Sequence, residues 1–156
     1  MSRCLQNQHT LAVAFIDLDG FKHINDEHGH DFGDDYLRAI ANRLKATVRE
    51  SDTVGRFGGD EFVLLLNNVG SQASHEHEAF NRIQKALSEP VSVHGRILPV
   101  SASIGVSLYP ADNSCLDAEQ LLRQADMAMY QGKHSGKGKL VVFKPEPVME
   151  ITERRH

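Results

Sequence analysis

Residues 55–66 read GRFGGDEFVLLL, and this stretch decides the fold class. Gly58 and Gly59 lie between two apolar segments. Because glycine reaches backbone torsions that other residues resist, the pair predicts a tight β-hairpin. Asp60 and Glu61 then lie at the tip of the hairpin, where the second strand begins. Acidic residues beside a turn are often only solvated, so the hairpin alone assigns them no chemistry.

A second acidic site follows the apolar run LAVAFID at residues 11–17, which predicts a strand buried on both faces. This strand delivers Asp17 and, two positions on, Asp19, before Gly20. Three interpretations of that pattern compete. They are an EF-hand calcium loop, a phosphatase-like nucleophile of the DxDG type, and a metal seat for a nucleotide.

The first two interpretations fit the residues poorly. An EF-hand loop that began at Asp17 would need an oxygen ligand at its fifth position and glycine at its sixth, where this chain has Phe21 and Lys22. A phosphatase would use Asp17 as nucleophile and Asp19 as acid or base, but that superfamily usually has Thr or Val in the place of Phe21. A convincing downstream lysine and acidic pair is also lacking, so the phosphatase stays as the weaker alternative.

The two acidic sites, considered together, favour the metal interpretation. Asp17 ends one predicted strand and Asp60 opens another, so their carboxylates converge if the two strands pair. Converging carboxylates raise each other's pKa unless a cation lies between them. Mg²⁺ suits such oxygen ligands and usually shares its shell with substrate phosphates. Two-metal nucleotidyl transfer is built in this way.

The rest of the chain alternates predicted helices and strands. Apolar residues recur at helical spacing from Asp34 onward and again in residues 73–88, which end before Pro90. Asp117 is placed to cap a third helix with its own apolar stripe. Hairpins combined with helices predict an α/β (α+β) fold, in which a mixed central β-sheet is flanked by helices, rather than a regular doubly wound sheet. Further strands are predicted at residues 91–95, 97–110 and 140–143.

Composition narrows the class of protein. The 156 residues suit a single domain, with 40% hydrophobic and 24% charged residues. The apolar runs are too short to cross a bilayer, and the N-terminus lacks the apolar core of an export signal. Cys4 and Cys115 form no ligand pair and are expected as reduced thiols, so we expect a cytoplasmic domain. A net charge of −4 argues against nucleic-acid binding, and an anionic ligand would need a local basic patch or bound cations.

Four ordered blocks resemble the GGDEF family, the diguanylate cyclases. The name-giving sequence GGDEF occupies residues 58–62, and DLDGFKHINDEHGHDFGDDYL at 17–37 is similar to the family's DxDxFKxxND…GHxxGDxxL block. SIGVSLYP at 103–110 and ADMAMYQGKHSGKGKL at 125–140 resemble its SxGVA-like strand and its ADxALYxAKxxGRN helix end. The resemblance covers residues 11–143, and four blocks in the family's order argue strongly against a chance match.

The resemblance implies a palm-like nucleotide cyclase fold and the condensation of two GTP into cyclic di-GMP and two pyrophosphates. Each 3′-hydroxyl would attack the α-phosphate of the other nucleotide. One domain would hold one GTP, so the resemblance also implies a homodimer of two facing half-sites. It further implies two Mg²⁺ ions in each half-site, with Mn²⁺ as an alternative ion.

The site residues that the resemblance implies fall into a metal group and a nucleotide group. Asp60 would be the general base as well as a metal ligand, and Glu61 a second acidic group. Asn25 and Asp34 would read guanine, whereas backbone amides near Phe21 and Lys22, with two lysines, would hold phosphates. The metal group is Asp17, the Leu18 carbonyl, Asp60 and Glu61, and the nucleotide group is Phe21, Lys22, Asn25, His30, Asp34, Gly58, Gly59, Lys133 and Lys137.

Several of these residues also have plain structural interpretations. Asp34 could be the N-terminal charge of its helix, where it would stabilise the helix dipole. Residues 133–139 could be an ordinary solvated basic helix end, and Asn25 could be a turn former. Asp19 belongs to the family block, but we assign it support of the loop rather than metal binding.

A second site is implied by RESD at residues 49–52, which matches the family's RxxD motif at its usual five-residue distance from Gly58. Arg49 would bind the product cyclic di-GMP through bidentate hydrogen bonds and inhibit the enzyme, and Asp52 would accept from guanine. The alternative is a salt bridge at a helix end.

The chain departs from the family in two places. Lys137 replaces the family's Arg, which exchanges a bidentate phosphate contact for a point charge. The family's upstream DxLTGLxNR stretch is missing, so we expect a fragment of a longer protein, in which other segments could anchor the chain to a membrane. Residues 1–143 would form the GGDEF domain. MEITERRH at 149–156 resembles the link to an EAL phosphodiesterase domain, so residues 144–156 would begin a linker to a downstream domain. In such a protein, a catalytically silent GTP- or cyclic-di-GMP-binding module is the alternative function.

Overall fold

A computed structural model describes residues 11–67, 73–109 and 117–143 of the chain. Cys4, Cys115 and the predicted linker at 144–156 lie outside these residues. Within the described ranges, the helices are too short or too polar to span a bilayer.

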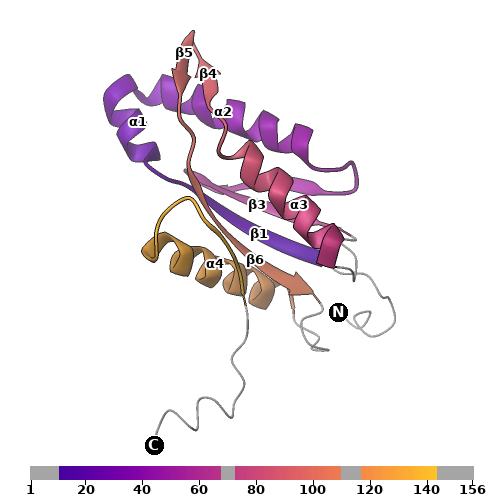
Figure 1. Ribbon diagram of the computed structural model, residues 1–156. Helices are drawn as coiled ribbons and strands as arrows, with labels where there is room; N and C mark the ends of the chain where they lie inside the picture. The colour runs from indigo at the N-terminus through magenta and orange to yellow at the C-terminus, as the bar shows by residue number, and fades with distance from the viewer. Residues whose placement is uncertain (1–10, 68–72, 110–116, 144–156) are drawn as a thin grey trace, which may run out of the picture.

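A five-stranded mixed sheet forms the centre of the domain (Figure 1). The middle strand, β1, pairs antiparallel with both β3 and β6, whereas β7 runs parallel to β6. The predicted mixed sheet is therefore confirmed. The strand order is β2-β3-β1-β6-β7, with β1 at Leu11–Leu18, β2 at Thr53–Gly58, β3 at Glu61–Leu66, β6 at Ala102–Tyr109 and β7 at Leu140–Val142.

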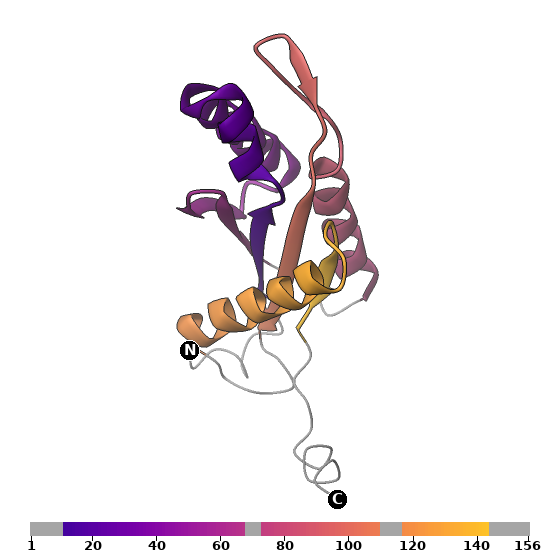
Figure 2. The same ribbon diagram turned by 90° about the vertical axis from the view of Figure 1, so that its left-hand side faces the viewer.

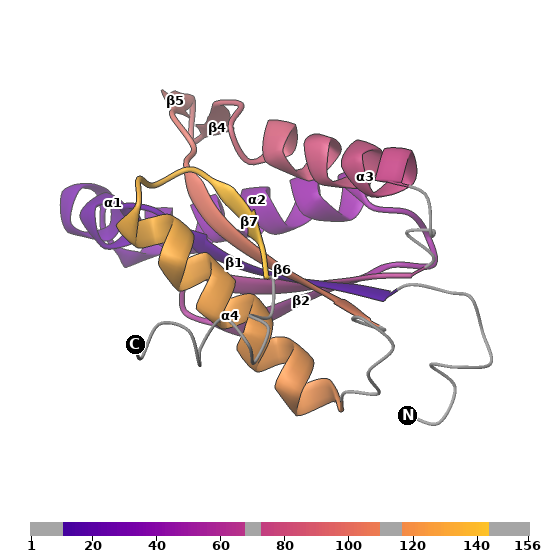
Figure 3. The same ribbon diagram turned by 60° about the horizontal axis from the view of Figure 1, so that its bottom comes forward.

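Helices cover both faces of this sheet. Figures 2 and 3 show α4 (Ala118–His134) crossing the sheet on the side opposite α2 (His30–Thr47) and α3 (Ala73–Ala86). The short helix α1 (Phe21–His28) precedes α2 on the same side. β4 (Val91–Val93) and β5 (Arg96–Leu98) form a separate two-stranded ribbon that contacts α2.

Strand β1 is buried on both faces, as its apolar sequence predicts. Ala12, Ala14 and Ile16 point into the larger core with α2 and α3, while Val13 and Phe15 belong to a smaller core under α4. Because a shift of one residue would exchange these two sets, the two cores fix the register of the strand. The position of the acidic residue at its end is fixed in the same way.

Three predicted boundaries were wrong. The helix expected from Asp34 begins at His30, and Phe21–His28 forms a helix that the sequence pattern did not reveal. Phe21 and Ile24 of α1 pack against the core, but two apolar residues in a helix of eight are too few to predict a helix from the sequence pattern. The expected strand at 97–110 is two strands, because β5 ends before Pro99 and proline cannot donate to a sheet ladder.

The start of α4 was predicted correctly. The Gln120 amide donates a hydrogen bond to the Asp117 side chain at 2.8 Å, and the Asp117 amide donates to the Gln120 side chain at 3.1 Å. This reciprocal pair is a capping box, which fixes the direction in which α4 leaves its loop.

Candidate active site

The end of β1 and the β2–β3 turn meet at one end of the sheet. Asp17 lies opposite Glu61 in the β1–β3 register, and the Leu18 amide donates a hydrogen bond to the Asp60 carbonyl oxygen at 3.1 Å. The strands that carry Asp17 and Asp60 therefore pair, which was the condition for their carboxylates to converge. The four members of the predicted metal group therefore lie at the same end of the sheet.

The electrostatics of this end of the sheet agree with that arrangement. Burial raises the pKa of Asp60, and the charge of Asp17 and a hydrogen bond between the two side chains raise that pKa further. Burial also raises the pKa of Glu61, with smaller contributions from the charges of Asp17, Asp60 and Asp126. The site thus concentrates negative charge, which favours a bound cation.

Lys133 of α4 provides a positive charge at this site. Its ammonium group donates a hydrogen bond to the Asp17 carboxylate, whose side chain is 12% exposed. Partial burial lowers the pKa of Lys133, but the hydrogen bond and the charges of Asp17 and its acidic neighbours outweigh burial, so the pKa is raised. The structure therefore places Lys133 on a predicted metal ligand, and its predicted phosphate contact stays a prediction.

The acidic pair fits a hard divalent cation such as Mg²⁺. Carboxylate and carbonyl oxygens are its preferred protein ligands, and Leu18 supplies a carbonyl group between Asp17 and the loop. Among the described residues, no three His, Cys, Asp or Glu side chains form a complete metal cluster. A cation here would therefore complete its shell with water or with the phosphates of a nucleotide.

Asp19 has a different role from Asp17. Its carboxylate accepts hydrogen bonds from Ser101 Oγ at 2.7 Å and Ser103 Oγ at 3.0 Å, and its amide donates to the Ser101 carbonyl oxygen at 2.8 Å. These bonds tie the loop after β1 to the start of β6, in agreement with the predicted support of the loop. Sequence reasoning missed both serines, whose signal was their alternation along the strand.

The supported loop leads into the N-terminus of α1. Gly20 has φ +75°, a left-handed conformation that favours glycine, and Phe21 and Lys22 are the first residues of the helix. Amide groups in the first turn of a helix have no intrahelical acceptor and attract anions. This position suits the predicted contacts of Phe21 and Lys22 with phosphates, which stay a prediction.

The side chain of Asn25 lies in a tight contact between α1 and α2. It packs on Gly33, where a Cβ atom would stand 1.8 Å from Asn25 Oδ1. That oxygen is buried and accepts no hydrogen bond from the residues that the structure describes. Sequence reasoning missed Gly33. His30, another predicted nucleotide contact, is exposed at the start of α2.

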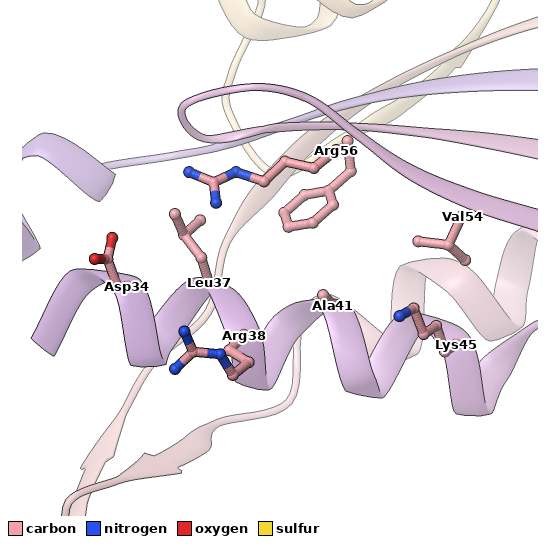
Figure 4. A pocket seen from close by; sticks show the side chains of 8 residues that line it. Asp34, Leu37, Arg38, Ala41, Lys45, Val54 and Arg56 are labelled. Atoms are coloured by element: carbon pink, nitrogen blue, oxygen red, sulfur yellow. The ribbon is translucent and has the colours of Figure 1, made fainter. Parts of the chain in front are cut away.

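Asp34 lies beyond the first turn of α2, so its alternative role as the N-terminal charge of that helix does not apply. Instead it lines a pocket of about 360 Å³ between α2 and the β2–β3 hairpin (Figure 4). Sequence reasoning missed Arg56 in this pocket, whose signal was its place just before the glycine pair. The pocket combines the apolar side chains of Leu37, Ala41, Val54 and Phe62 with the cations Arg38, Lys45 and Arg56.

The glycine pair leaves space at the hairpin tip. Beyond its chain neighbours, no heavy atom lies within 4 Å of the place where a Cβ of Gly59 would stand. A Cβ at Gly58 would lie 2.9 Å from Glu61 Oε1.

Lys137 is exposed in the segment after α4, and the ion pair of Asp17 is made by Lys133 instead. The structure thus does not join Lys137 to the acidic centre.

The predicted product site lies at the turn between α2 and β2. The side chain of Asp52 is 2% exposed, and its carboxylate accepts hydrogen bonds from the amides of Arg49 and Asn67, both at 2.9 Å. The Arg49 guanidinium lies 3.5 Å from the same carboxylate and donates to the Asn67 carbonyl oxygen. The alternative interpretation, a salt bridge at a helix end, is therefore present. The contact of Asp52 with product stays a prediction.

The mixed sheet flanked by helices places the chain in the class of palm-like α/β domains. The family model described as "Diguanylate cyclase, GGDEF domain" matches residues 1–139 of the chain. The chain belongs to the GGDEF family, as the sequence blocks predict.

Relatives of known name and structure are similar over most of this chain. The cyclic di-GMP phosphodiesterase NbdA of Pseudomonas aeruginosa is 38% identical over 98% of the chain, which spans 19% of NbdA. The diguanylate cyclase TpbB of the same organism is 43% identical over 88% of the chain and 32% of its own length. The crystal structure of an EAL/GGDEF domain protein from M. capsulatus has a TM-score of 0.79 at 39% identity and covers 90% of this chain and 88% of that one. The chain thus spans only a third or less of the length of these two curated relatives.

Proposed function

We propose that this domain condenses two GTP molecules into cyclic di-GMP with loss of two pyrophosphates. The observation that carries the proposal is the convergence of Asp17 and Asp60 at the end of two paired strands. Burial and the charge of Asp17 raise the pKa of Asp60, and a cation between the two carboxylates would offset this repulsion and bind nucleotide phosphates. Similarity to TpbB, which is named a diguanylate cyclase, supports the same activity.

In this proposal the acidic centre holds Mg²⁺ and receives a proton. Asp17, the Leu18 carbonyl, Asp60 and Glu61 would be the ligands. When bound, Mg²⁺ polarises the α-phosphate and makes the 3′-hydroxyl more acidic. Asp60 takes the proton of the 3′-hydroxyl, whose oxygen then bonds to the α-phosphorus of the other GTP. The bond from that phosphorus to the β-phosphate oxygen breaks, and pyrophosphate leaves.

Other residues would select and hold the nucleotide. The carboxylate of Asp34 can accept from both N1–H and the 2-amino group of guanine, a donor pair that adenine lacks. Asn25, which packs against Gly33 between α1 and α2, would contact the base through its side-chain amide group. Amides at Phe21 and Lys22, with Lys133 and Lys137, would hold the β- and γ-phosphates. Because one domain would hold one GTP, the reaction requires two copies that face each other.

The proposal is tested by GTP turnover with Mg²⁺ in the wild type and in Asp60→Ala, each fused to a dimerising coiled coil. We expect the wild type to form cyclic di-GMP and Asp60→Ala to lose about 100-fold or more of the rate. Arg123→Ala removes an exposed charge from α4 and serves as the control, with unchanged turnover. A wild type that binds GTP tightly but forms no cyclic dinucleotide would refute the cyclase.

That outcome would support a second candidate, a silent module that binds GTP or cyclic di-GMP. Its support is the similarity to NbdA, which is named a phosphodiesterase although it contains a comparable stretch. The substitution at Lys137 favours the same candidate, because it weakens a phosphate contact.

We also propose product inhibition through Arg49. The guanidinium would bind a phosphate or guanine edge of cyclic di-GMP, while Asp52 holds the turn through the amides that it accepts. Arg49→Ala should therefore raise the yield of cyclic di-GMP, measured as product accumulated over time. An inhibition curve identical to that of the wild type would refute this role.

A further inference from the structure

Arg56 occupies a position that joins the hairpin tip to the pocket beside α2. It pairs with Phe62 in the β2–β3 register, and the register shifts before Gly58 pairs with Glu61. Phe57 is the residue within this irregularity, and its ring contacts Phe15 of the smaller core at a centroid distance of 5.5 Å. Arg56 instead lines the pocket against α2. Arg56 and Phe57 thus point to opposite faces of the sheet, as neighbouring residues of a strand do.

The inner nitrogen of Arg56 holds the turn that carries the acidic residues. Its Nε atom donates to the carbonyl oxygens of Gly58 at 3.3 Å and Gly59 at 3.2 Å. These two carbonyl groups immediately precede Asp60 in the chain. Both contacts come from one charged N–H group and lie near the long end of the range for N–H···O hydrogen bonds. They restrain a glycine pair that has few conformational limits of its own.

The outer part of the same guanidinium extends along the pocket toward Leu37 and Asp34 (Figure 4). Arg56 therefore lies between the residue proposed to read the base and the turn proposed to hold the cation. Arg38 and Lys45 also line this pocket, but from α2 rather than from the hairpin. Among these three cations, Arg56 is the one that belongs to the strand leading into the turn.

We propose that Arg56 is a positioning residue that fixes the β2–β3 turn, so that the carboxylate of Asp60 is held facing Asp17 before substrate binds. The inference rests on the proposed function of the acidic centre. Removal of a residue that orients a metal ligand typically costs about 10- to 100-fold in metal affinity or activity. If Arg56 were only an ordinary surface charge, its removal would lower neither metal affinity nor activity.

The experiment compares the wild type with Arg56→Ala, Arg56→Lys and the control Arg123→Ala, an exposed arginine of α4. The first readout is binding of Mn²⁺ to the nucleotide-free protein, followed by electron paramagnetic resonance. We expect Arg56→Ala to weaken Mn²⁺ binding about 10-fold. The Mn²⁺ affinity of Arg56→Lys should lie between those of Arg56→Ala and the wild type, and the affinity of Arg123→Ala should equal that of the wild type. The second readout is turnover, where kcat should fall about 10-fold or more in Arg56→Ala with little change in KM.

Unchanged Mn²⁺ affinity in Arg56→Ala would overturn the proposal, and so would a loss confined to KM, which would make Arg56 a substrate contact. If the wild type forms no cyclic di-GMP, the proposed function fails, yet Mn²⁺ binding still decides the role of Arg56. If Arg56→Ala does not fold, the Mn²⁺ affinity of Arg56→Lys decides whether Arg56 positions the turn. Lysine lacks the planar Nε–H that reaches two carbonyl oxygens, so its Mn²⁺ affinity must still fall below that of the wild type.

Discussion

Asp17 and Asp60 carry like charges at the ends of two paired strands, and strand pairing rather than mutual attraction holds them together. Lys133 offsets part of this charge through its hydrogen bond to Asp17. Burial and the remaining repulsion from Asp17 raise the pKa of Asp60 in the folded protein. Residues whose ionisation the fold opposes are typical of sites that bind an ion or transfer a proton.

Asp60→Asn should therefore stabilise the metal-free domain at neutral pH. A raised pKa means that the folded state holds this proton more tightly than the unfolded state, so stability is lost as pH rises through the unfolded and then the folded pKa. The site is partly open to solvent, which screens the effect, so we expect melting temperature to rise by about 1–3 °C. The difference should vanish near about pH 3, where both states are protonated. A variant that melts below the wild type at neutral pH would contradict this account.

Gly33→Ala should disturb base binding without unfolding the domain. The new methyl group would stand 1.8 Å from Asn25 Oδ1, so the Asn25 side chain must move. Loss of one hydrogen bond to the base should raise KM for GTP about 10-fold, measured in steady-state assays. Gly55→Ala is a matched control, because its Cβ would lie 3.9 Å from the Val63 carbonyl oxygen. Equal KM values for the two variants would show that Asn25 does not contact the nucleotide.

At the scale of elements, the close packing of α4 on β6 brings Lys133 to the acidic centre. Gly105 of β6 lies under the helix, where a Cβ would stand 2.0 Å from the Ala125 carbonyl oxygen and 2.2 Å from the Met129 amide nitrogen. Both atoms belong to the backbone, so no side chain can move to make room. Because Gly105 has no side chain, α4 can lie close to the sheet, and its last turn then brings Lys133 to the site.

Gly105→Ala should accordingly destabilise the domain by about 3 kcal/mol, because overpacking at this contact forces the helix away from the sheet. Urea denaturation would measure the change in free energy of unfolding. Gly55→Ala of the edge strand β2 is again the control, with an ordinary contact distance. A loss below about 0.5 kcal/mol would mean that α4 does not depend on this close approach.

At the scale of the whole molecule, the sequence predicts the parts that depend on local pattern. The apolar run of β1, the glycine pair of the hairpin and the cap of α4 are short-range signals, and the structure confirms each. The family and the mixed sheet are confirmed as well. Helix α1 was missed because its eight residues include only two apolar side chains, Phe21 and Ile24, which form too short a pattern.

Contacts between distant segments could not be read from the sequence. Lys133 and Asp17 are 116 positions apart, and Ser101 and Asp19 are 82 apart, so no local pattern links them. The sequence predicts that Asp17 and Asp60 converge only if their strands pair, and strand pairing depends on contacts between distant segments. The homodimer, the product site, the linker and the cytoplasmic location stay predictions.

We propose that Asp17 and Asp60 share a cation beside the phosphates of a nucleotide. Anomalous diffraction from crystals grown with Mn²⁺ and a nonhydrolysable GTP analogue would locate this cation. We expect a Mn²⁺ peak within bonding distance, about 2.1 Å, of an oxygen from each carboxylate and next to the phosphates. A nucleotide bound elsewhere, or a peak that contacts only one of the two aspartates, would contradict it.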